Sequence, residues 1–443
     1  MRVPVDPPKL GQVFEEVARA GMLMDVYMGN FSSEVQDDYI HWDKLRHKTP
    51  PKGLTPRTWW AAIKFARLAL RQELALQDKH GQSFSVSIST RLLKSLHYID
   101  LEASGATRKS KGLGKSGRRF IRSLIEESIA SSQLEGATTS CAVAKEMLIT
   151  GRPPRDQSER MIYSNYLAMK LVRERGKRRF TVDEILELHA LITAGTMESE
   201  GDCGRLRDAD DNVLIFDRGS DTMLHTPPPA REVRERLERL CEFANGQNED
   251  PFIHPVVRAI AIHFQIGYDH PFCDGNGRTA RVLFYWSMMN SGYWLTEYLS
   301  ISSVLRKSQG NYMRAYLYTE HDDSDMTYFI SQQLDAIEQS IAGLHAYIKS
   351  KSDQKRQVHR TLGTSRVAGI ELNHRQRALL ANALNDPDRG YTVATHRAAH
   401  QISYPTALGD LTALVHAGLF ETQKAGRAYE YLPASDFADR LRT

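Results

Sequence analysis

Apolar residues recur every three or four positions through most of this chain, and this spacing restricts the possible folds more than any other feature. Residues at such intervals lie on one face of an α-helix. One helix is predicted to begin where Thr55, an N-cap residue, precedes Pro56 at the first helical position. The same spacing occurs in seven later stretches, residues 120–134, 161–172, 182–192, 229–244, 256–267, 279–289 and 328–347. The middle of the chain is therefore predicted to be all-α.

Only two short stretches of this helical region are predicted to be extended. Residues 212–216 and 223–226 flank a polar turn, and a run of three prolines from residue 227 ends the second stretch. Two short extended segments around a turn are typical of a β-hairpin. A small hairpin is therefore expected within an otherwise helical domain.

The last 70 residues show a different order of elements. Helices are predicted at 375–384, 393–401 and 405–417, with Gly418 as the C-cap of the third helix and two short strands around 423–427. Three helices followed by a strand pair is the order of a winged helix-turn-helix domain.

The chain of 443 residues is too long for a single domain of usual size. We expect an N-terminal helical region over residues 1–90 and a main helical domain over 91–345. Residues 346–370 are rich in Lys, Arg, Ser, Gln and Gly, which predicts a linker or the frayed end of a helix. The winged helix-turn-helix domain is expected over 371–443.

Composition indicates a protein of the cytoplasm that does not cross a membrane. No apolar run approaches the ~20 residues of a membrane helix, and the first residues lack the apolar block of a secretory signal. The four cysteines are widely separated, so we expect reduced thiols. Lys and Arg outnumber Asp and Glu by 58 to 54, and this small excess does not argue for nucleic-acid binding.

The chemistry is concentrated in residues 270–281, HPFCDGNGRTAR. Gly275, Asn276 and Gly277 are predicted to begin a helix, where unpaired backbone N–H groups and the helix dipole attract an anion. Arg278 and Arg281 lie three positions apart on the same helix, and a polyphosphate would satisfy both charges. This combination predicts a phosphate-binding site.

Two further residues of this segment supply reactive groups. Asp274 provides a hard carboxylate oxygen beside the phosphate site, where Mg²⁺ is commonly held by one or two carboxylates and substrate phosphates. His270, just before the turn, is able to take a proton near neutral pH. Together these residues suit the attack of a hydroxyl on a phosphate.

At every specified position this segment resembles the signature of Fic proteins, HxFx(D/E)GN(G/K)RxxR, and the resemblance extends over about residues 120–345. It implies an enzyme that transfers AMP from ATP to a Ser, Thr or Tyr hydroxyl of a protein. In that reaction His270 is the general base, Asp274 holds Mg²⁺, and the 275–277 turn with Arg278 and Arg281 binds the phosphates. Glycine at position 277, where the kinase-like branch of the family has lysine, favours nucleotidyl transfer.

The resemblance also gives the predicted hairpin a role. Members of the Fic family dock the target protein as an added strand against a flap beside the catalytic loop. In this chain the flap corresponds to the hairpin, and the docking residues are expected to be Val213, Leu214, Ile215, His225 and Thr226. The alternative is an ordinary surface hairpin.

A second motif lies upstream, within a helix predicted near residues 120–136. Ser131 to Gly136, SSQLEG, resembles the family's inhibitory pattern (S/T)xxxE(G/N). The resemblance implies that Ser131, Glu135 and Gly136 are regulatory and that Glu135 pairs with Arg281 in place of the γ-phosphate. The alternative is a solvent-exposed glutamate that caps its helix.

Two other functions stay open at this point. The fold is also compatible with removal of AMP from a modified protein, or with transfer from another nucleotide. Alternatively, the chain is a DNA-binding regulator with a nucleotide-sensing Fic domain. In that case its wing and third helix would present a set of residues to DNA, namely Tyr404, Thr406, Asp410, Lys424 and Arg427.

The third helix of the tail is mostly uncharged, which favours protein docking or dimerisation over DNA binding. We expect a protein target, self-modification and a homodimer as the candidate interactions. His189 and His263 lie within apolar helical patterns, so they are predicted to be core residues and not ligands.

Overall fold

The computed structural model divides into two compact units, Met1–Leu344 and His345–Thr443, and each is described by itself. It describes residues 2–27, 31–104, 117–217, 219–246, 251–362, 366–367, 370–385, 389–425, 428–434 and 436–440.

The first unit is built mainly from helices, so the predicted helical architecture is confirmed. Its α-helices are α1 Leu10–Arg19, α2 Leu23–Tyr27, α3 Trp42–Leu45, α4 Pro56–Leu68, α5 Thr90–Ala103, α6 Gly117–Leu134, α7 Cys141–Thr150, α8 Gln157–Arg175, α9 Val182–Thr193, α10 Val233–Ala244, α11 Pro255–Asp269, α12 Asn276–Asn290, α13 Ile301–Lys307, α14 Gln309–His321 and the start of α15 Thr327–Leu362. Short 3₁₀ helices are η2 Glu200–Asp202, η3 Ala209–Asp211, η4 Ala230–Glu232 and η5 Trp294–Tyr298.

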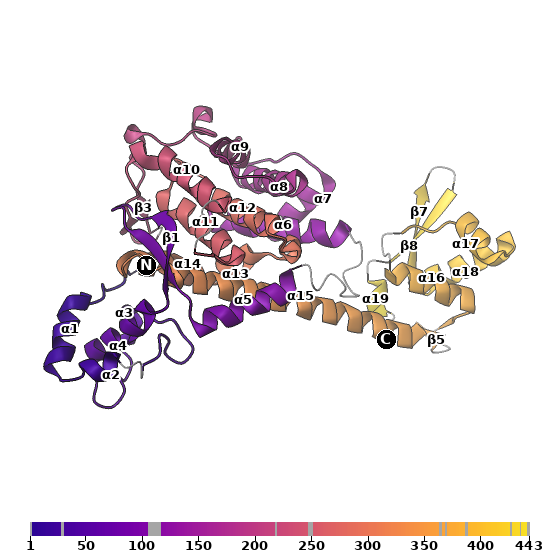
Figure 1. The fold of residues 1–443 in the computed structure, drawn as a ribbon. Helices are drawn as coiled ribbons and strands as arrows, with labels where there is room; N and C mark the ends of the chain where they lie inside the picture. Colours follow the sequence, from indigo (N-terminus) through magenta and orange to yellow (C-terminus); the bar gives the residue numbers. More distant parts are fainter. Residues whose placement is uncertain are drawn as a thin grey trace. The chain divides into compact units, whose positions relative to one another are not determined.

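Helices α11 and α12 run through the middle of this unit, among α6, α8, α9 and α10 (Figure 1). Their side chains are buried on nearly every face: Phe264 of α11 and Trp286 of α12 are completely buried. Phe272, in the turn between the two helices, is also completely buried. A helix with apolar residues all round requires such a position. The segment between α11 and α12 is therefore held at both ends by the rigid part of the core.

Two hairpins accompany these helices. Strands β1 Arg71–Gln77 and β2 Ser83–Ser87 pair antiparallel. The region 1–90, predicted to be helical, therefore also contains a β-hairpin. The alternation Ser-Phe-Ser-Val-Ser in β2 is a period-two signal that is short and easily overlooked. Strands β3 Ile215–Phe216 and β4 Met223–His225 form the hairpin predicted within 212–226.

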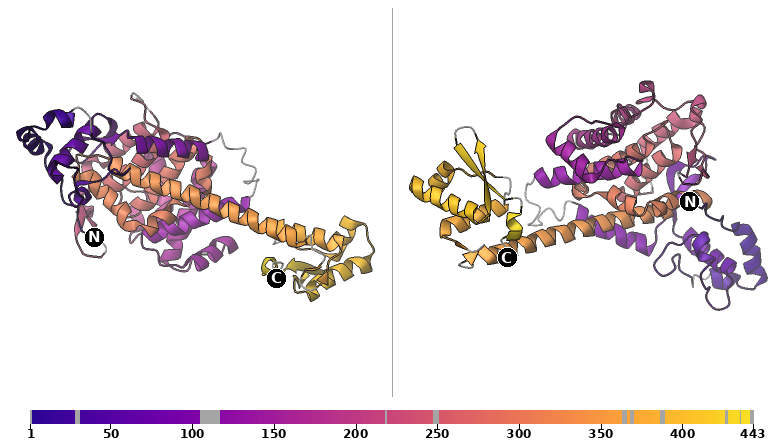
Figure 2. Two further views of the ribbon diagram at one scale, coloured as in Figure 1. Left: turned by 90° about the horizontal axis from the view of Figure 1, so that it is seen from below. Right: turned by 180° about the vertical axis from the view of Figure 1, so that it is seen from behind.

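The N-terminal helices α1 to α4 gather at one end of the first unit (Figure 2). Thr55 caps α4 and Pro56 begins it, as predicted. Two buried polar contacts join α4 to the rest of the unit: Lys64 Nζ lies 2.7 Å from Asp322 Oδ1, and Arg67 donates to the Tyr328 hydroxyl at 2.7 Å.

The second unit has its own small core, which includes Leu380, Leu411, Leu414 and Phe420. Its elements after α15 are β5 Arg366–Val367, β6 Ile370–Glu371, α16 His374–Asn385, α17 Val393–His400, α18 Tyr404–His416, β7 Phe420–Ala425, β8 Ala428–Pro433 and α19 Phe437–Arg440. The three helices and the strand pair predicted for the tail are present.

For residues 346–370 the structure agrees with the helix-end alternative and not with a linker. Helix α15 continues to Leu362, and β5 and β6 follow it. The Lys, Arg and Gln residues that suggested a linker are also good helix formers, so a polar composition did not exclude a helix here.

One of the residues predicted to face a DNA groove is placed elsewhere. Asp410 is only 6% exposed and accepts hydrogen bonds from Arg375, Asn373 and His396. Its prediction as a groove residue was wrong, because the carboxylate ties α18 to its neighbours. Tyr404, Thr406 and Lys424 are exposed. Arg427 lies outside the described residues.

None of the described helices has the length and apolar character that a membrane crossing requires. The four cysteines are free thiols.

Candidate active site

A cavity of about 700 Å³ lies beside the 270–281 segment. Its walls come from the C-terminal end of α6, the β3–β4 hairpin, residues 267–277 and helix α14. Among the residues of α14 that line it are Tyr312, Met313, Tyr316 and Glu320, none of which the sequence pattern had suggested. Aromatic and apolar side chains with a few polar groups are the usual lining of a small-molecule site.

The turn into α12 has the geometry of an anion site. Gly275 has a φ of 79°, and a Cβ atom there would lie 2.6 Å from Thr193 Cγ2, so no other residue fits. The N–H of Thr279 makes the first helical bond, to the Gly275 carbonyl at 2.9 Å. The N–H groups before it, of residues 276 to 278, have no acceptor within the helix. Asn276 and Gly277 line the cavity.

Side chains lock this turn in place. Asn276 accepts from the Phe272 N–H at 3.0 Å and donates to the Phe272 carbonyl at 2.7 Å. The His189 ring stacks on Phe272 with centroids 3.6 Å apart. Asn276 therefore fixes the turn with its side chain and leaves its backbone for a ligand.

His189 is completely buried, as predicted for a core residue. Its Nδ1 accepts from the Gly204 N–H at 3.0 Å, so Nε2 carries the hydrogen and donates to the Asp274 carbonyl at 2.9 Å. Burial lowers the pKa of His189 to about 4, so the ring is neutral. It acts as a fixed support for the 270–281 segment.

His270 lies directly after α11, in the left-handed conformation with a φ of 45°. Its Nδ1 is 2.8 Å from the Gly267 carbonyl, which can only accept. Nδ1 therefore carries the hydrogen, and Nε2 is the proton acceptor. Desolvation lowers the pKa of His270 to about 4, which keeps the imidazole neutral at physiological pH.

The two arginines of the segment have separate partners. Arg278 is completely buried and donates to the Ile192 carbonyl at 3.0 Å and to Asp274 Oδ2 at 3.3 Å. Arg281 donates to Ser131 and lies 2.7 Å from Glu135 Oε1. The pair predicted to share one polyphosphate is thus divided between two carboxylates, and neither arginine is among the residues that line the cavity.

Glu135 lies over the start of α12. A Cβ atom added at Gly277 would be 2.1 Å from Glu135 Oε1, so the carboxylate rests against the helix N-terminus. Burial opposes the charge on Arg281, but Glu135 together with Tyr312 and Glu127 outweighs this effect, and the pKa of Arg281 is raised. Gly136, with a φ of 101°, ends the helix directly after Glu135. The structure therefore brings the predicted regulatory residues to the anion site.

The hairpin forms the opposite wall. Leu214, Ile215 and His225 line the cavity, whereas Val213 and Thr226 do not. His225 is 9% exposed, and its ring bridges Glu320 Oε2 at 2.7 Å and the Tyr268 carbonyl at 2.8 Å. This residue, predicted to dock a target, anchors the hairpin to the core instead.

Asp274 offers a carboxylate ligand for a divalent cation in the cavity. The Asp274 side chain is 60% exposed, and only Oδ2 is engaged by Arg278. No group of three or more His, Cys, Asp or Glu residues able to hold a metal occurs in the described part of the chain. A single carboxylate suits Mg²⁺ bound largely through substrate phosphates and water.

Residues 179–288, which contain this segment, match the model of the Fic/DOC family. This match confirms the predicted Fic domain. In addition, the chain is 26% identical over 277 residues to the protein adenylyltransferase Fic of Drosophila yakuba, which is 62% of this chain and 50% of that protein. The corresponding protein of Nematostella vectensis is 26% identical over 171 residues, 37% of each chain. These matches cover half or less of each relative's length.

The fold of the Fic domain also has a solved counterpart. A Fic family protein from Desulfovibrio desulfuricans G20 superposes with a TM-score of 0.51 at 19% identity, over 78% of this chain and 95% of that one. At this level of identity the likeness concerns the fold alone.

Proposed function

We propose that this protein transfers AMP from ATP to a hydroxyl group of a protein. The observation that carries the proposal is that the neutral imidazole of His270 and the N-terminus of α12 open onto the same cavity. The relatives named protein adenylyltransferase support the same reaction.

The reaction needs few groups from the chain. The hydroxyl oxygen of the target forms a bond to the α-phosphorus, the bond from that phosphorus to the α,β-bridging oxygen breaks, and pyrophosphate leaves. His270 Nε2 takes the hydroxyl proton, because Nδ1 is already bonded to the Gly267 carbonyl. The N–H groups at residues 276 to 278 stabilise the negative charge of the phosphates.

Asp274 would hold Mg²⁺ together with the nucleotide phosphates. The bound cation would neutralise charge on the phosphates and the leaving pyrophosphate. Arg278 supports this arrangement through its bond to the same carboxylate.

Glu135 serves as an internal inhibitor in this proposal. Its carboxylate lies against Gly277 and Arg281, where an anionic phosphate would otherwise bind. Two anions do not share one site, so ATP must displace Glu135 or bind in an unproductive position. Low activity is therefore the resting state.

The target would add to the β3 strand of the hairpin as an extended segment. Phe216 in β3 and Leu214 just before it are 49% and 44% exposed, so apolar side chains of a target have partners. Pairing through the backbone reads little sequence. The hairpin therefore supports docking of an extended chain and does not define one target.

Intact-mass analysis after incubation with ATP and Mg²⁺ tests the proposal. We expect the Glu135→Gly protein to gain the mass of one or more AMP groups, or to pass labelled AMP to an added protein. The double variant with His270→Ala is the matched control and should gain none. Binding of ATP without any transfer would contradict the proposed reaction.

Removal of AMP from a modified protein is the second candidate. The position of Glu135 within the cavity favours it, because a carboxylate there is able to orient a water molecule. Wild type would then release AMP from a modified protein, whereas Glu135→Gly would not.

We further propose that residues 371–443 are a winged helix-turn-helix domain that docks a protein or a second copy of this chain. The order α16, α17, α18, β7 and β8 supports this, as does the burial of Asp410. A gel-shift titration across salt concentrations tests the DNA-binding alternative, which predicts binding that weakens steeply with salt. The cytoplasm stays the predicted location.

A further inference from the structure

Arg207, in the loop between η2 and η3, contacts the turn that carries His270. Its side chain is largely buried, at 8% exposed. Nε donates to the His270 carbonyl at 2.7 Å, and Nη2 donates to the Asp269 carbonyl at 3.2 Å. The Arg207 backbone N–H donates to the Pro271 carbonyl at 2.9 Å. Three consecutive carbonyl groups thus accept hydrogen bonds from one residue.

These carbonyl groups lie where α11 ends. The last carbonyls of a helix have no partner within it, and they carry the negative end of the helix dipole. A guanidinium group satisfies both their hydrogen bonding and their charge. Arg207 therefore fits this position on electrostatic grounds alone.

The bonds act on a backbone conformation that is unfavourable by itself. His270 has a φ of 45°, in the left-handed region that is unfavourable for a non-glycine residue. Such a conformation persists only where its surroundings fix it. The hydrogen bonds on both sides of His270 and on its own carbonyl provide this constraint.

The same guanidinium also reaches the hairpin wall. Nη2 of Arg207 donates to the Pro228 carbonyl. Pro228 lies three residues after His225, the last residue of β4. One side chain therefore connects the exit of the hairpin with the turn that bears the imidazole. The end of the hairpin and the His270 turn are therefore bonded to the same side chain, that of Arg207.

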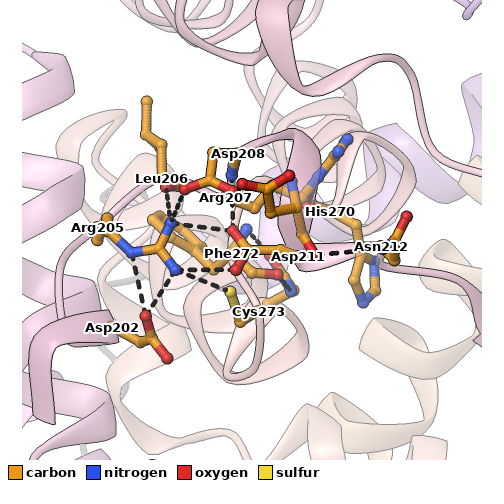
Figure 3. Close-up of polar contacts among 12 residues, drawn as sticks. Asp202, Arg205, Leu206, Arg207, Asp208, Asp211, Asn212, His270, Phe272 and Cys273 are labelled. Carbon is orange, nitrogen blue, oxygen red and sulfur yellow. Dashed lines mark hydrogen bonds and ion pairs between the residues drawn. The ribbon is translucent and has the colours of Figure 1, made fainter. Parts of the chain in front are cut away.

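The loop that carries Arg207 is itself held by Arg205. Arg205 donates to both carboxylate oxygens of Asp211, at 2.9 and 3.0 Å, and to Asp202 Oδ1 (Figure 3). It also lies 3.6 Å from the sulfur of Cys273, within the 270–281 segment. Arg205 and the Asp208 N–H hold the pKa of Asp211 well below its usual range. The carboxylate therefore stays charged and keeps its bonds to Arg205.

We propose that Arg207 is the positioning residue of His270: through the carbonyls of Asp269, His270 and Pro271 it holds the imidazole in its reactive orientation and links it to the hairpin. The inference rests on the proposed transfer reaction. Arg207 makes these contacts through backbone groups of the protein and takes no part in proton transfer.

The test uses the full chain with Glu135→Gly, so that activity is measurable. Arg207→Met removes the cation and keeps an unbranched side chain, and Arg207→Lys restores a cation that reaches fewer carbonyls. We expect kcat for AMP transfer to fall about 100-fold in Arg207→Met and about tenfold in Arg207→Lys, since small displacements of a reacting group have effects of this size. KM for ATP should change by less than about threefold. Arg234→Met, an exposed arginine of α10, is the matched control.

A second readout separates positioning from general damage. Release of His270 from its desolvated position should raise its pKa from about 4 toward the ordinary value of about 6.5. The acid limb of kcat/KM then moves to higher pH in both Arg207 variants, and not in Arg234→Met. The ring resonance of His270, titrated by NMR, reports the same change without any turnover.

Several results would overturn the inference. One is a folded Arg207→Met protein with kcat within twofold of its parent and an unmoved acid limb. Another is an equal loss of ATP affinity and kcat, which would indicate damage to the phosphate site. Should Arg207→Met not fold, unchanged kcat and an unchanged His270 titration in Arg207→Lys would overturn it. A Glu135→Gly parent without AMP transfer would contradict the proposed reaction instead, and the NMR titration would still decide the role of Arg207.

Discussion

Two walls of the cavity, the 270–281 segment and the β3–β4 hairpin, differ in how firmly they are held. On the side of the 270–281 segment, Phe272 is completely buried and Asn276 is 2% exposed, and both are bonded to each other. On the hairpin side, Leu214 just before β3 and Phe216 in that two-residue strand are about half exposed. One wall is a packed support, and the other offers free side chains and a free strand edge.

This difference in rigidity indicates which function each wall is suited to. Proton transfer and phosphate binding need groups fixed within fractions of an ångström, and only a packed wall supplies that. Docking of an extended peptide needs an accessible edge. In the proposed reaction the packed wall would set the chemistry, and the hairpin wall would set how the target is presented. The following predictions test this division, from the largest expected effect to the smallest.

The largest effect is expected at His270. In the Glu135→Gly background, His270→Ala should lower AMP transfer by about 10²- to 10⁴-fold, the usual contribution of a general base. ATP affinity, measured by calorimetry, should stay the same, because the phosphates contact the turn and not the imidazole. A parallel loss of ATP affinity would contradict this division. It would mean that His270 also contributes to phosphate binding.

Removal of the Glu135 carboxylate, the proposed inhibitor, should have the next largest effect. Glu135→Gly is expected to raise AMP transfer about 10- to 100-fold, because a charge-assisted hydrogen bond contributes about 1.5 to 3 kcal/mol. Glu135→Gln should give a smaller gain. Glu126→Gln changes a partly exposed glutamate of α6, the helix that ends just before Glu135, and should give none. Equal rates in Glu135→Gly and wild type, with ATP bound in both, would show that Glu135 does not occupy the phosphate site.

A change on the hairpin wall should have a modest and selective effect. Phe216→Ser is expected to lower labelled AMP incorporation into acceptor protein about three- to tenfold, as an exposed apolar contact is lost. ATP affinity should not change. Phe252→Ser, at an exposed phenylalanine outside the cavity lining, is the control. If Phe216→Ser instead reduced ATP affinity, the hairpin would belong to the nucleotide site.

The smallest effect concerns pH. Because the pKa of His270 is lowered to about 4, the base is neutral above this value and is lost only as the pH falls through it. Between pH 7.5 and 5 we expect kcat/KM of the Glu135→Gly protein to change less than about twofold. A midpoint near 6.5 would show an imidazole in contact with water, and the packed wall would then be more open than described here.

Local features of the site were predictable from the sequence. The 270–281 segment contains the base, the carboxylate and the glycines close together in sequence, from His270 to Gly277, so neighbouring residues alone define the turn. The capped start of α4 and the 215–225 hairpin are equally local. By contrast, β1 and β2 were missed because a five-residue alternation is a weak signal beside the helical spacing around it.

Contacts between distant residues were predicted only in part. Glu135 and Arg281 are 146 residues apart, and their pairing followed from the family resemblance and not from any spacing. Arg207 was missed because its acceptors are backbone carbonyls, which every residue has and no sequence pattern marks. Asp410 was misassigned for a related reason: an acidic residue on a helix gives no sign that three side chains of its domain surround it.

The sequence by itself determined which reactive groups this protein has and that a glycine-lined helix start follows its histidine, because backbone conformation over a few residues depends on those residues. Only the tertiary structure decided how these groups are used. Packing separated Arg278 from Arg281, set Glu135 against Gly277 and placed Arg207 on the carbonyls around His270. These contacts depend on which segments pack together in the core, where a buried charge is stable only when it is paired.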